Sequence, residues 1–189
     1  MKYRTLSQTG EKLSAAGLGC MGMSFAYGPV DDIESIATLH KALDLGINFW
    51  DTADMYANGK NEELISKVLV ENRKKVFIAT KFGFRFKDGK AGSSNSPNTI
   101  IDGSPEWIKQ AVELSLKRLG IETIDLYYAH RIDPKVPVEE TVAAMEIWLN
   151  KERFDTWVFL KRLQQPSGKQ MRFIRYQHCK VNIQYLRET

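Results

Sequence analysis

The sequence predicts an α/β protein built on a parallel sheet, and two observations support this class. Three short, largely apolar runs, at 47–50, 76–80 and 124–129, each end at a polar residue, and segments with helical spacing lie between them. Unbroken apolar runs are typical of strands covered on both faces, whereas strands with one solvated face alternate apolar and polar residues. Strands that alternate with helices in this way indicate repeated βα units.

A small hairpin is expected before the repeats. Residues 3–6 and 12–15 flank a turn signal at Thr9-Gly10, which predicts two short antiparallel strands. A weaker strand is predicted around Leu18 and Gly19, where the series of parallel strands begins. With the three apolar runs, this makes four βα units after the hairpin.

Helix start and stop signals divide the segments between the strands. Asp31 lies three residues before Glu34, which is the pattern of a capping box, and Gly46 marks the end of that helix. Pro105 directly after Ser104 is typical of a helix start. The four helices are expected to begin at Asp31, Asn61, Ser104 and Pro137.

Apolar residues three and four positions apart predict the buried side of each helix. The residues expected to face inward are, helix by helix, Ile33, Ile36, Leu39 and Leu43; Leu64, Ile65, Val68 and Leu69; Ile108, Ala111, Val112, Ser115 and Leu119; and Val138, Val142 and Met145.

One connection, residues 82–103, is long and rich in Gly, Ser and Asn. A structureless connection of this length inside a compact domain is usually functional or disordered. It would leave the C-terminal end of a strand, where the substrate loops of α/β folds lie. Phe82, Phe84 and Phe86 alternate along its first part, which is compatible with the wall of a substrate site and equally with an extension of the strand.

Composition and charge exclude several classes of protein. The 189 residues carry a formal charge of +4, but residues 1–146 hold 18 Lys or Arg against 20 Asp or Glu, so the body of the chain has no basic face for nucleic acid. No apolar run is long enough to cross a membrane, and the polar N-terminus lacks a signal peptide. Two cysteines make no disulfide framework. We therefore expect a cytoplasmic protein that binds neither nucleic acid nor membrane.

Three ionisable residues end successive strands: Asp51, Lys81 and His130, with Tyr56 five positions after Asp51. Each alone has a simpler explanation as a turn residue, a solvated charge or a satisfied polar group. The carboxyl ends of parallel strands, however, meet at one edge of a sheet, where active sites form. We therefore expect these four side chains to lie together.

Their combined chemistry suits the reduction of a carbonyl group. An ammonium near a phenol lowers the phenol pKa from about 10, and an adjacent carboxylate keeps the lysine charged and in place. Tyr56 could then transfer a proton, while His130 donates a hydrogen bond to the substrate oxygen. None of these groups delivers hydride, which a nicotinamide cofactor would have to supply.

At these residues the chain resembles the aldo-keto reductase family. The matching segments are GLGCMG at 17–22, NFWDTADMY at 48–56 with NEE at 61–63, TKFG at 80–83 and IDLYYAHR at 124–131, within a resemblance that spans residues 3–146. It implies a TIM (β/α)₈ barrel, NADPH as the cofactor and aldehydes or ketones as small-molecule substrates, with no metal. The resemblance makes Tyr56 the general acid, tuned by Lys81.

The same resemblance assigns the remaining roles. Asp51 pairs with Lys81, His130 orients the carbonyl, and Asp51, Gly22 and Met23 bind the cofactor. Accessory proteins of this family that bind the cofactor and act through partners are an alternative, as is an aldolase in which Lys81 forms a Schiff base. Neither the carbonyl substrate nor the oligomeric state can be read from the sequence.

The resemblance ends at residue 146, so we expect an incomplete barrel of one hairpin and about four βα units. At 189 residues the chain is shorter than the roughly 250 typical of the closed barrel. Residues 147–189 form an aberrant basic tail, with nine Lys or Arg against three Asp or Glu, and we expect it to be poorly ordered. Half a barrel exposes strand edges, which predicts aggregation and negligible carbonyl reduction.

The tail also permits a different explanation. Reading its codons one base earlier allows a continuation that begins DLVKQGKVRYLGLSEAS, which resembles the missing fifth unit of the family. We hypothesise that a base was lost, or a splice junction moved, near residues 146–147. Genomic and transcript reads across this junction test the hypothesis, and an in-frame tail in both would refute it. The alternative function is then a truncated product without catalytic activity.

Overall fold

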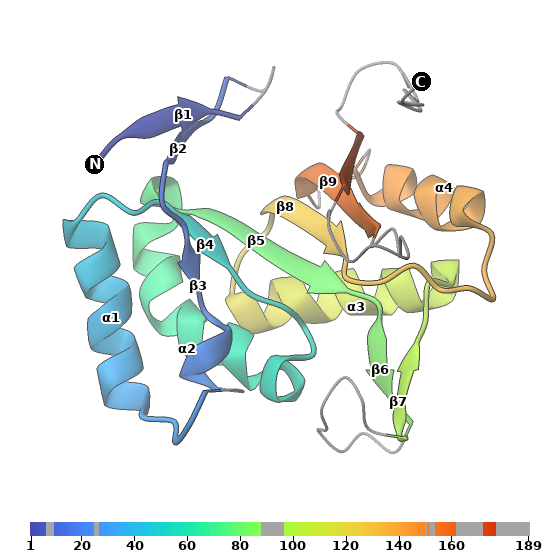
Figure 1. The fold of residues 1–189 in the computed structure, drawn as a ribbon, viewed down its shortest axis with the longest axis horizontal. Coiled ribbons are helices and arrows are strands. Elements are labelled where there is room, and N and C mark those ends of the chain that lie inside the picture. Colours follow the sequence, from blue (N-terminus) through green and yellow to red (C-terminus); the bar gives the residue numbers. More distant parts are fainter. Residues whose placement is uncertain are drawn as a thin grey trace, which may run out of the picture.

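A six-stranded sheet forms the centre of the computed structural model (Figure 1). The structure describes residues 1–6, 10–24, 27–87, 97–149 and 151, and the backbone of two further strands at 154–161 and 172–176. The order of the sheet is β10-β9-β8-β5-β4-β3. Its strands are β3 (Leu18–Gly19), β4 (Phe49–Asp51), β5 (Phe77–Phe82), β8 (Ile124–Ala129), β9 (Phe154–Lys161) and β10 (Arg172–Tyr176).

Neighbouring strands from β3 to β9 are parallel, in chain order, which confirms the predicted α/β class and the incomplete barrel. β9 lies after residue 146, where the resemblance to the family ends. β10 pairs with β9 in the antiparallel direction, so the sheet ends in a hairpin that the sequence analysis did not predict. The other residues of the predicted tail (150, 152–153, 162–171 and 177–189) lie outside the described residues.

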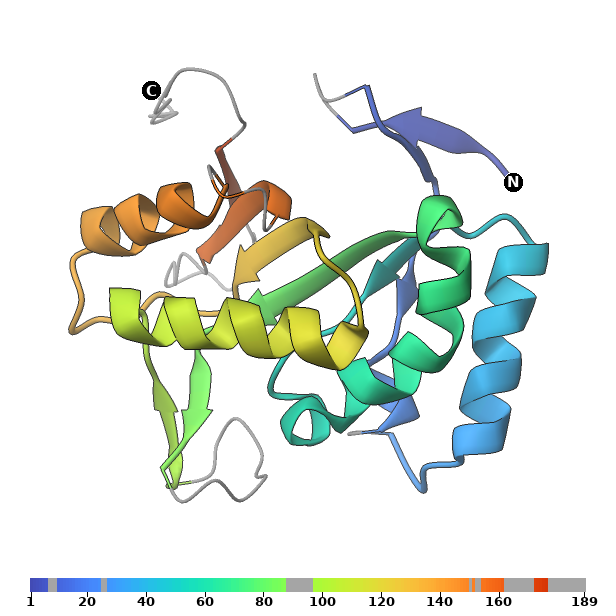
Figure 2. The same ribbon diagram turned by 180° about the vertical axis from the view of Figure 1, so that it is seen from behind.

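Helices α1 (Asp32–Asp44), α2 (Lys60–Leu69) and α3 (Pro105–Leu119) cover one face of the sheet, as the view from behind shows (Figure 2). α4 (Val138–Leu149) lies beside β9 and crosses the predicted division of the chain at residue 146. Short 3-10 helices follow β3, β4 and α2: η1 (Met21–Met23), η2 (Tyr56–Gly59) and η3 (Val70–Lys75). Among the described residues, no helix is long and apolar enough to cross a membrane.

Local capping explains where α1 and α3 begin. The Asp31 carboxylate accepts hydrogen bonds from the backbone amides of Ile33 and Glu34, at 2.8 and 3.1 Å. Ser104 Oγ accepts from the Trp107 amide at 3.2 Å, and α3 ends at Gly120 in the left-handed conformation, with φ 66°. Both starts confirm the sequence predictions.

Two predictions about the helices are wrong. Asn61 does not cap α2, because the left-handed Gly59 precedes the helix and Asn61 is a fully buried residue within its first turn. The Asn61 side chain instead makes hydrogen bonds to the loops that follow β3 and β4. Ile33 was expected to face inward, but it is 82% exposed, because it lies in the first turn of α1, whose buried residues begin at Ser35.

The main core lies between the sheet and the helices. Trp50 and Ile78 from neighbouring strands point to this side, where they meet Leu39, Ile65 and Ile108 from α1, α2 and α3. Alternate residues of the same strands point to the other face, and there Phe77, Ala79 and Leu126 pack with Leu13 of the N-terminal hairpin.

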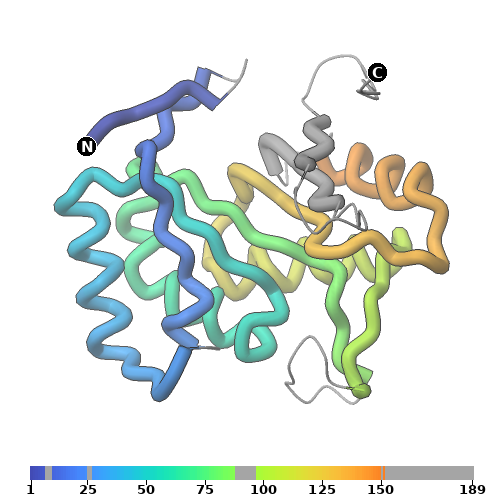
Figure 3. Tube along the Cα trace, viewed as in Figure 1, coloured from blue at the N-terminus to red at the C-terminus, as the bar shows by residue number. Residues whose placement is uncertain are grey.

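The N-terminal hairpin, β1 (Tyr3–Thr5) and β2 (Lys12–Ser14), lies at the amino ends of the parallel strands (Figure 3). Its register pairs Tyr3 with Ser14 and confirms the predicted hairpin. Asn48, directly before β4, fastens it: the Asn48 amide group accepts from Ser14 N at 2.7 Å and donates to the Lys12 carbonyl at 2.8 Å.

An aspartate sets the pairing of β5 with β8. Asp125 Oδ2 accepts from the Ile78 amide at 2.7 Å, and Arg73 Nη2 donates to Asp125 Oδ1 at 2.9 Å. Because these contacts cross between strands, they hold the register in which Lys81 lies opposite Tyr128.

A second hairpin projects from the carboxyl end of β5 (Figure 1). It consists of β6 (Phe84–Phe86) and β7 (Thr99–Ile101), joined to β5 through Gly83 with φ 119°. The segment 82–103 therefore contains two strands rather than a structureless connection, and residues 88–96 lie outside the described residues. Phe82 belongs to β5, and Phe84 and Phe86 belong to the strand extension that the sequence allowed.

Candidate active site

The four predicted catalytic residues come together at the carboxyl edge of the sheet. Asp51 ends β4, Lys81 is the fifth residue of β5, His130 directly follows β8, and Tyr56 begins η2. The parallel register pairs Asp51 with Ala79 and Lys81 with Tyr128, so these strand ends are level with one another. The structure thus brings to one place residues that are up to 79 positions apart in the sequence.

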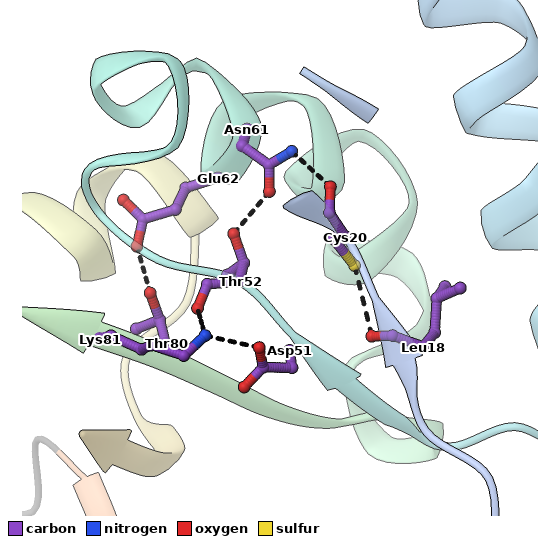
Figure 4. Close-up of polar contacts among 8 residues, drawn as sticks. All are labelled: Leu18, Cys20, Asp51, Thr52, Asn61, Glu62, Thr80 and Lys81. Atoms are coloured by element: carbon purple, nitrogen blue, oxygen red, sulfur yellow. Dashed lines mark hydrogen bonds and ion pairs between the residues drawn. The ribbon is translucent and has the colours of Figure 1, made fainter. Parts of the chain in front are cut away.

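Lys81 is held from two sides (Figure 4). Its Nζ lies 2.5 Å from Asp51 Oδ1 and donates to the Thr52 carbonyl at 2.7 Å. The same atom lies 5.3 Å from the centre of the Tyr56 ring. The Lys81 side chain is 8% exposed and that of Asp51 is 32% exposed, so solvent screens this ion pair only in part.

His130 completes the site as a neutral imidazole. Its ring lies 6.1 Å from the Tyr56 ring and 4.9 Å from the Phe84 ring, edge to face with both. Burial lowers the pKa of His130 to about 3, and the positive charges of Lys81 and Arg131 act in the same direction. At neutral pH the ring therefore carries one N–H and one acceptor nitrogen, which suits hydrogen bonding to a carbonyl oxygen.

The pKa of Tyr56 moves opposite to the sequence expectation. Burial, together with the smaller effect of the negative charge of Asp51, raises it to about 12. The expectation used the adjacent carboxylate only to keep Lys81 charged and in place, whereas the charge of Asp51 also acts on the Tyr56 phenol and raises its pKa. Tyr56 therefore keeps its proton at neutral pH, as a proton donor must.

Two of the predicted cofactor residues, Gly22 and Met23, lie in η1 but differ in their exposure to solvent. Gly22 is exposed in η1, after β3, whereas the Met23 side chain packs in the main core with Leu39 and Trp50 and is turned away from the site. Met21 is the methionine of η1 that packs against the cluster containing Tyr56. The sequence analysis expected Met23 to bind the cofactor, and this stays a prediction.

Gly19, which pairs with Asp51, and Gly22 in η1 are both exposed. A Cβ added to Gly19 would meet no atom within 4 Å, and one added to Gly22 would meet only the Tyr27 ring, at 3.4 Å. These glycines leave open space next to the partly exposed Asp51 carboxylate, which is compatible with the nicotinamide end of a cofactor. Within the described residues, no cluster of three or more His, Cys, Asp or Glu could hold a metal ion.

The sequence analysis missed the polar groups that support the site. Thr52 Oγ1 donates to Asn61 Oδ1 at 2.6 Å, and Asn61 Nδ2 donates to the Cys20 carbonyl at 2.8 Å (Figure 4). One signal was present in the sequence: Asn61 lies three and four positions before Leu64 and Ile65, which places it on the same buried face of α2.

A cluster of charged residues is buried behind the site. Arg118 Nη1 donates to Glu62 Oε2 at 3.1 Å, and Thr80 Oγ1 donates to Glu62 Oε1 at 2.7 Å. Glu62 is fully buried and Asp54 is 6% exposed. Burial raises the pKa of both carboxyl groups, that of Asp54 well above its ordinary value, and the charge of Glu62 raises the pKa of Asp54 further.

Comparisons with known proteins agree with this architecture. The sequence profile of the Aldo/keto reductase family matches residues 15–151. The chain is 41% identical over 138 residues to aldo-keto reductase yakc (NADP(+)) of Schizosaccharomyces pombe, covering 72% of this chain and 39% of that protein. It is 43% identical over 143 residues to probable aldo-keto reductase 1 of Glycine max, covering 75% and 39%.

Solved structures give the same family. Aldo-keto reductase AKR11C1 from Bacillus halodurans superposes with a TM-score of 0.73 at 32% identity, covering 85% of this chain and 50% of that one. Glycerol dehydrogenase AKR11B4 from Gluconobacter oxydans gives 0.71 at 31% identity, covering 83% and 47%.

The chain belongs to the aldo-keto reductase family, and its parallel sheet is part of the barrel of that family. It spans 39% of the length of the two curated relatives, so it corresponds to part of such a protein.

Proposed function

We propose that this chain carries the proton-transfer residues of an NADPH-dependent oxidoreductase that reduces aldehydes or ketones to alcohols. The observation that carries the proposal is the placement of Lys81 between Asp51 and the Thr52 carbonyl, 5.3 Å from the centre of the Tyr56 ring. The relatives' membership of the family and the NADP(+) in one relative's name support the choice of cofactor.

The chemistry follows from the ionisation of the four groups. The substrate oxygen accepts hydrogen bonds from the Tyr56 hydroxyl and from the neutral His130 ring, which together polarise the carbonyl. The hydride for the carbonyl carbon would come from NADPH when it is bound at this edge of the sheet. Tyr56 then gives its proton to the oxygen, and the charge of Lys81, held in place by Asp51, stabilises the phenolate that is left.

Cofactor contacts at this edge of the sheet come from Asp51 and from the open backbone around Gly22. With the Met23 side chain in the core, we assign to Met23 only its backbone and to Met21 the apolar contact next to Tyr56. The aromatic residues Phe84 and Phe86, in the same cluster as Tyr56, form one wall of the substrate site.

The test is aldehyde-dependent oxidation of NADPH, followed by the loss of nicotinamide absorbance. Wild-type chain and a Tyr56→Phe variant are compared, since the variant keeps the ring and loses the proton donor. Loss of the donor is expected to lower the rate about 10²- to 10⁴-fold.

The alternative that the same experiment distinguishes is a product without catalytic activity. In that case wild type and Tyr56→Phe oxidise NADPH equally slowly. Titration with NADPH, watched by its fluorescence, separates this outcome further: binding without turnover indicates an accessory protein, and no binding indicates an inactive product. Trapping with borohydride would identify an aldolase by covalent modification of Lys81.

A further inference from the structure

We infer that Asn61 is a positioning residue of the active site, one that fixes Lys81 and the turn carrying Gly22 in a single arrangement. The inference rests on the proposed function for its catalytic meaning, but the arrangement itself can be tested without turnover. Asn61 acts on the catalytic side chains through Thr52 and through the turn after β3.

The first connection leads to Lys81 (Figure 4). Asn61 Oδ1 accepts from Thr52 Oγ1 at 2.6 Å, and the carbonyl of the same Thr52 accepts from Lys81 Nζ at 2.7 Å. Thr52 lies directly after β4, and its amide still donates to the Ala79 carbonyl of β5 at 2.9 Å, so the side chain adds a second anchor to one made by the backbone. Its side-chain bond to Asn61 therefore helps to fix the direction of the carbonyl that holds the ammonium.

The second connection leads to the proposed cofactor contacts. Asn61 Nδ2 donates to the Cys20 carbonyl at 2.8 Å and to Ser24 Oγ at 3.0 Å. Cys20 and Ser24 flank η1, the turn that carries Gly22. One amide group thus connects both ends of this turn.

The position of Asn61 makes these bonds stable. The residue is fully buried in the first turn of α2, and Thr52 is also fully buried. Removing the amide leaves the buried Thr52 hydroxyl without its acceptor, and it leaves the Cys20 carbonyl with only its bond from the Met23 amide, at 3.0 Å. Asn61 does not cap α2, and Asn has a lower helix propensity than Ala, so local helix stability does not explain its presence here.

Asn48 provides a matched control at the other end of β4. It also ties strand and loop together, through 2.7 and 2.8 Å hydrogen bonds to Ser14 and Lys12, but at the amino end of the sheet. Asn48→Ala removes bonds of the same kind as Asn61→Ala without touching Thr52. A general loosening of the fold would affect the two variants alike.

The experiment measures the accessibility of the Lys81 amine in the intact chain. Trace acetylation with acetic anhydride, quantified by mass spectrometry, gives the labelling rate of Lys81 relative to the exposed Lys60. We expect Asn61→Ala to raise this ratio about five- to tenfold and Asn48→Ala to change it less than twofold. Equal increases in both variants, or no increase in a folded Asn61→Ala, would overturn the inference.

A second pair of variants decides the matter if Asn61→Ala does not fold. Thr52→Val has nearly the same shape and loses only the hydroxyl, whereas Thr52→Ser keeps it. Lys81 labelling should rise in the valine variant and stay at the wild-type rate in the serine variant. The inference fails if the two variants behave alike.

If the wild type oxidises NADPH, its kinetic constants distinguish the connection to Lys81 from the connection to the turn that carries Gly22. Thr52→Val should lower kcat about tenfold with little change in KM for NADPH, since a small misplacement of a catalytic group costs one to two orders of magnitude. Ser24→Ala should raise KM for NADPH and leave Lys81 labelling unchanged. If the wild type shows no NADPH oxidation, the proposed function fails, while the labelling ratios still accept or reject the role of Asn61.

Discussion

Replacing Arg118 with Met tests the buried charged cluster behind the active site. Arg118 is the cation paired with Glu62 at 3.1 Å, and Glu62 is fully buried. Removing one partner of a buried ion pair costs about 3–5 kcal/mol, because the other charge stays in the core without compensation. We expect Arg118→Met to lower the free energy of unfolding by about this amount at pH 7.5, measured by urea denaturation with circular dichroism.

The penalty should depend on pH in a defined direction. The pKa values of Glu62 and Asp54 are already raised in the folded chain, and loss of Arg118 raises them further. A group whose pKa is raised on folding stabilises the protein at low pH and loses that contribution as the pH rises through its folded pKa. Acidification should therefore reduce the penalty, by up to about 1.4 kcal/mol for each pH unit over which the variant holds one extra proton.

Lys67→Met is the matched control. Lys67 pairs with Asp32 at 3.5 Å, and both side chains are more than half exposed. Exposed pairs contribute only about 0–1 kcal/mol, so the control should remain close to wild type at every pH. The reasoning is refuted if Arg118→Met costs no more than Lys67→Met, or if its penalty grows on acidification.

Other predictions concern protonation and packing. Because the pKa of His130 is about 3, NMR of ¹³C-labelled histidine should find its ring neutral from pH 8 down to pH 5, and protonation near pH 6.5 would contradict the buried placement. The difference in phenolate absorbance between wild type and Tyr56→Phe should stay near zero up to about pH 10, since the pKa of Tyr56 is raised to about 12; a step below pH 9 would contradict this. Ile124→Ala, at a fully buried position, should cost about 2–5 kcal/mol in urea denaturation, whereas Ile33→Ala, at a position 82% exposed, should stay within about 0.5 kcal/mol; similar losses would show that burial does not set the cost.

The sequence predicted those parts of the fold that depend on neighbouring residues. Ser104 and Pro105 mark the start of α3, because a helix cap acts within one helical turn. The parallel strands were also predictable, since a strand buried on both faces needs an unbroken apolar run. Once these strands are parallel, Asp51, Lys81 and His130 must meet at one edge.

The features that the sequence did not predict depend on residues that are far apart in the chain. Asn61 looked like a helix cap because the residues that use its amide, Cys20 and Thr52, lie 41 and 9 positions away. The pKa of Tyr56 was predicted in the wrong direction for a similar reason, since both its burial and the position of Asp51 against Lys81 follow from tertiary packing. The side of η1 on which Met21 and Met23 lie is likewise set by contacts with α1 and with the cluster around Tyr56.

The hydrogen bond from Ile78 to Asp125 has a consequence for the opposite end of the same strands. Side chains alternate along β5, so sliding this strand past β8 by a single step would exchange Thr80 and Lys81 between the two faces. The ammonium would then point at Glu62 among the helices, and Asp51 would lose its partner. By fixing the register at the amino end of β5, Asp125 keeps Lys81 on the face of the sheet where Asp51 lies.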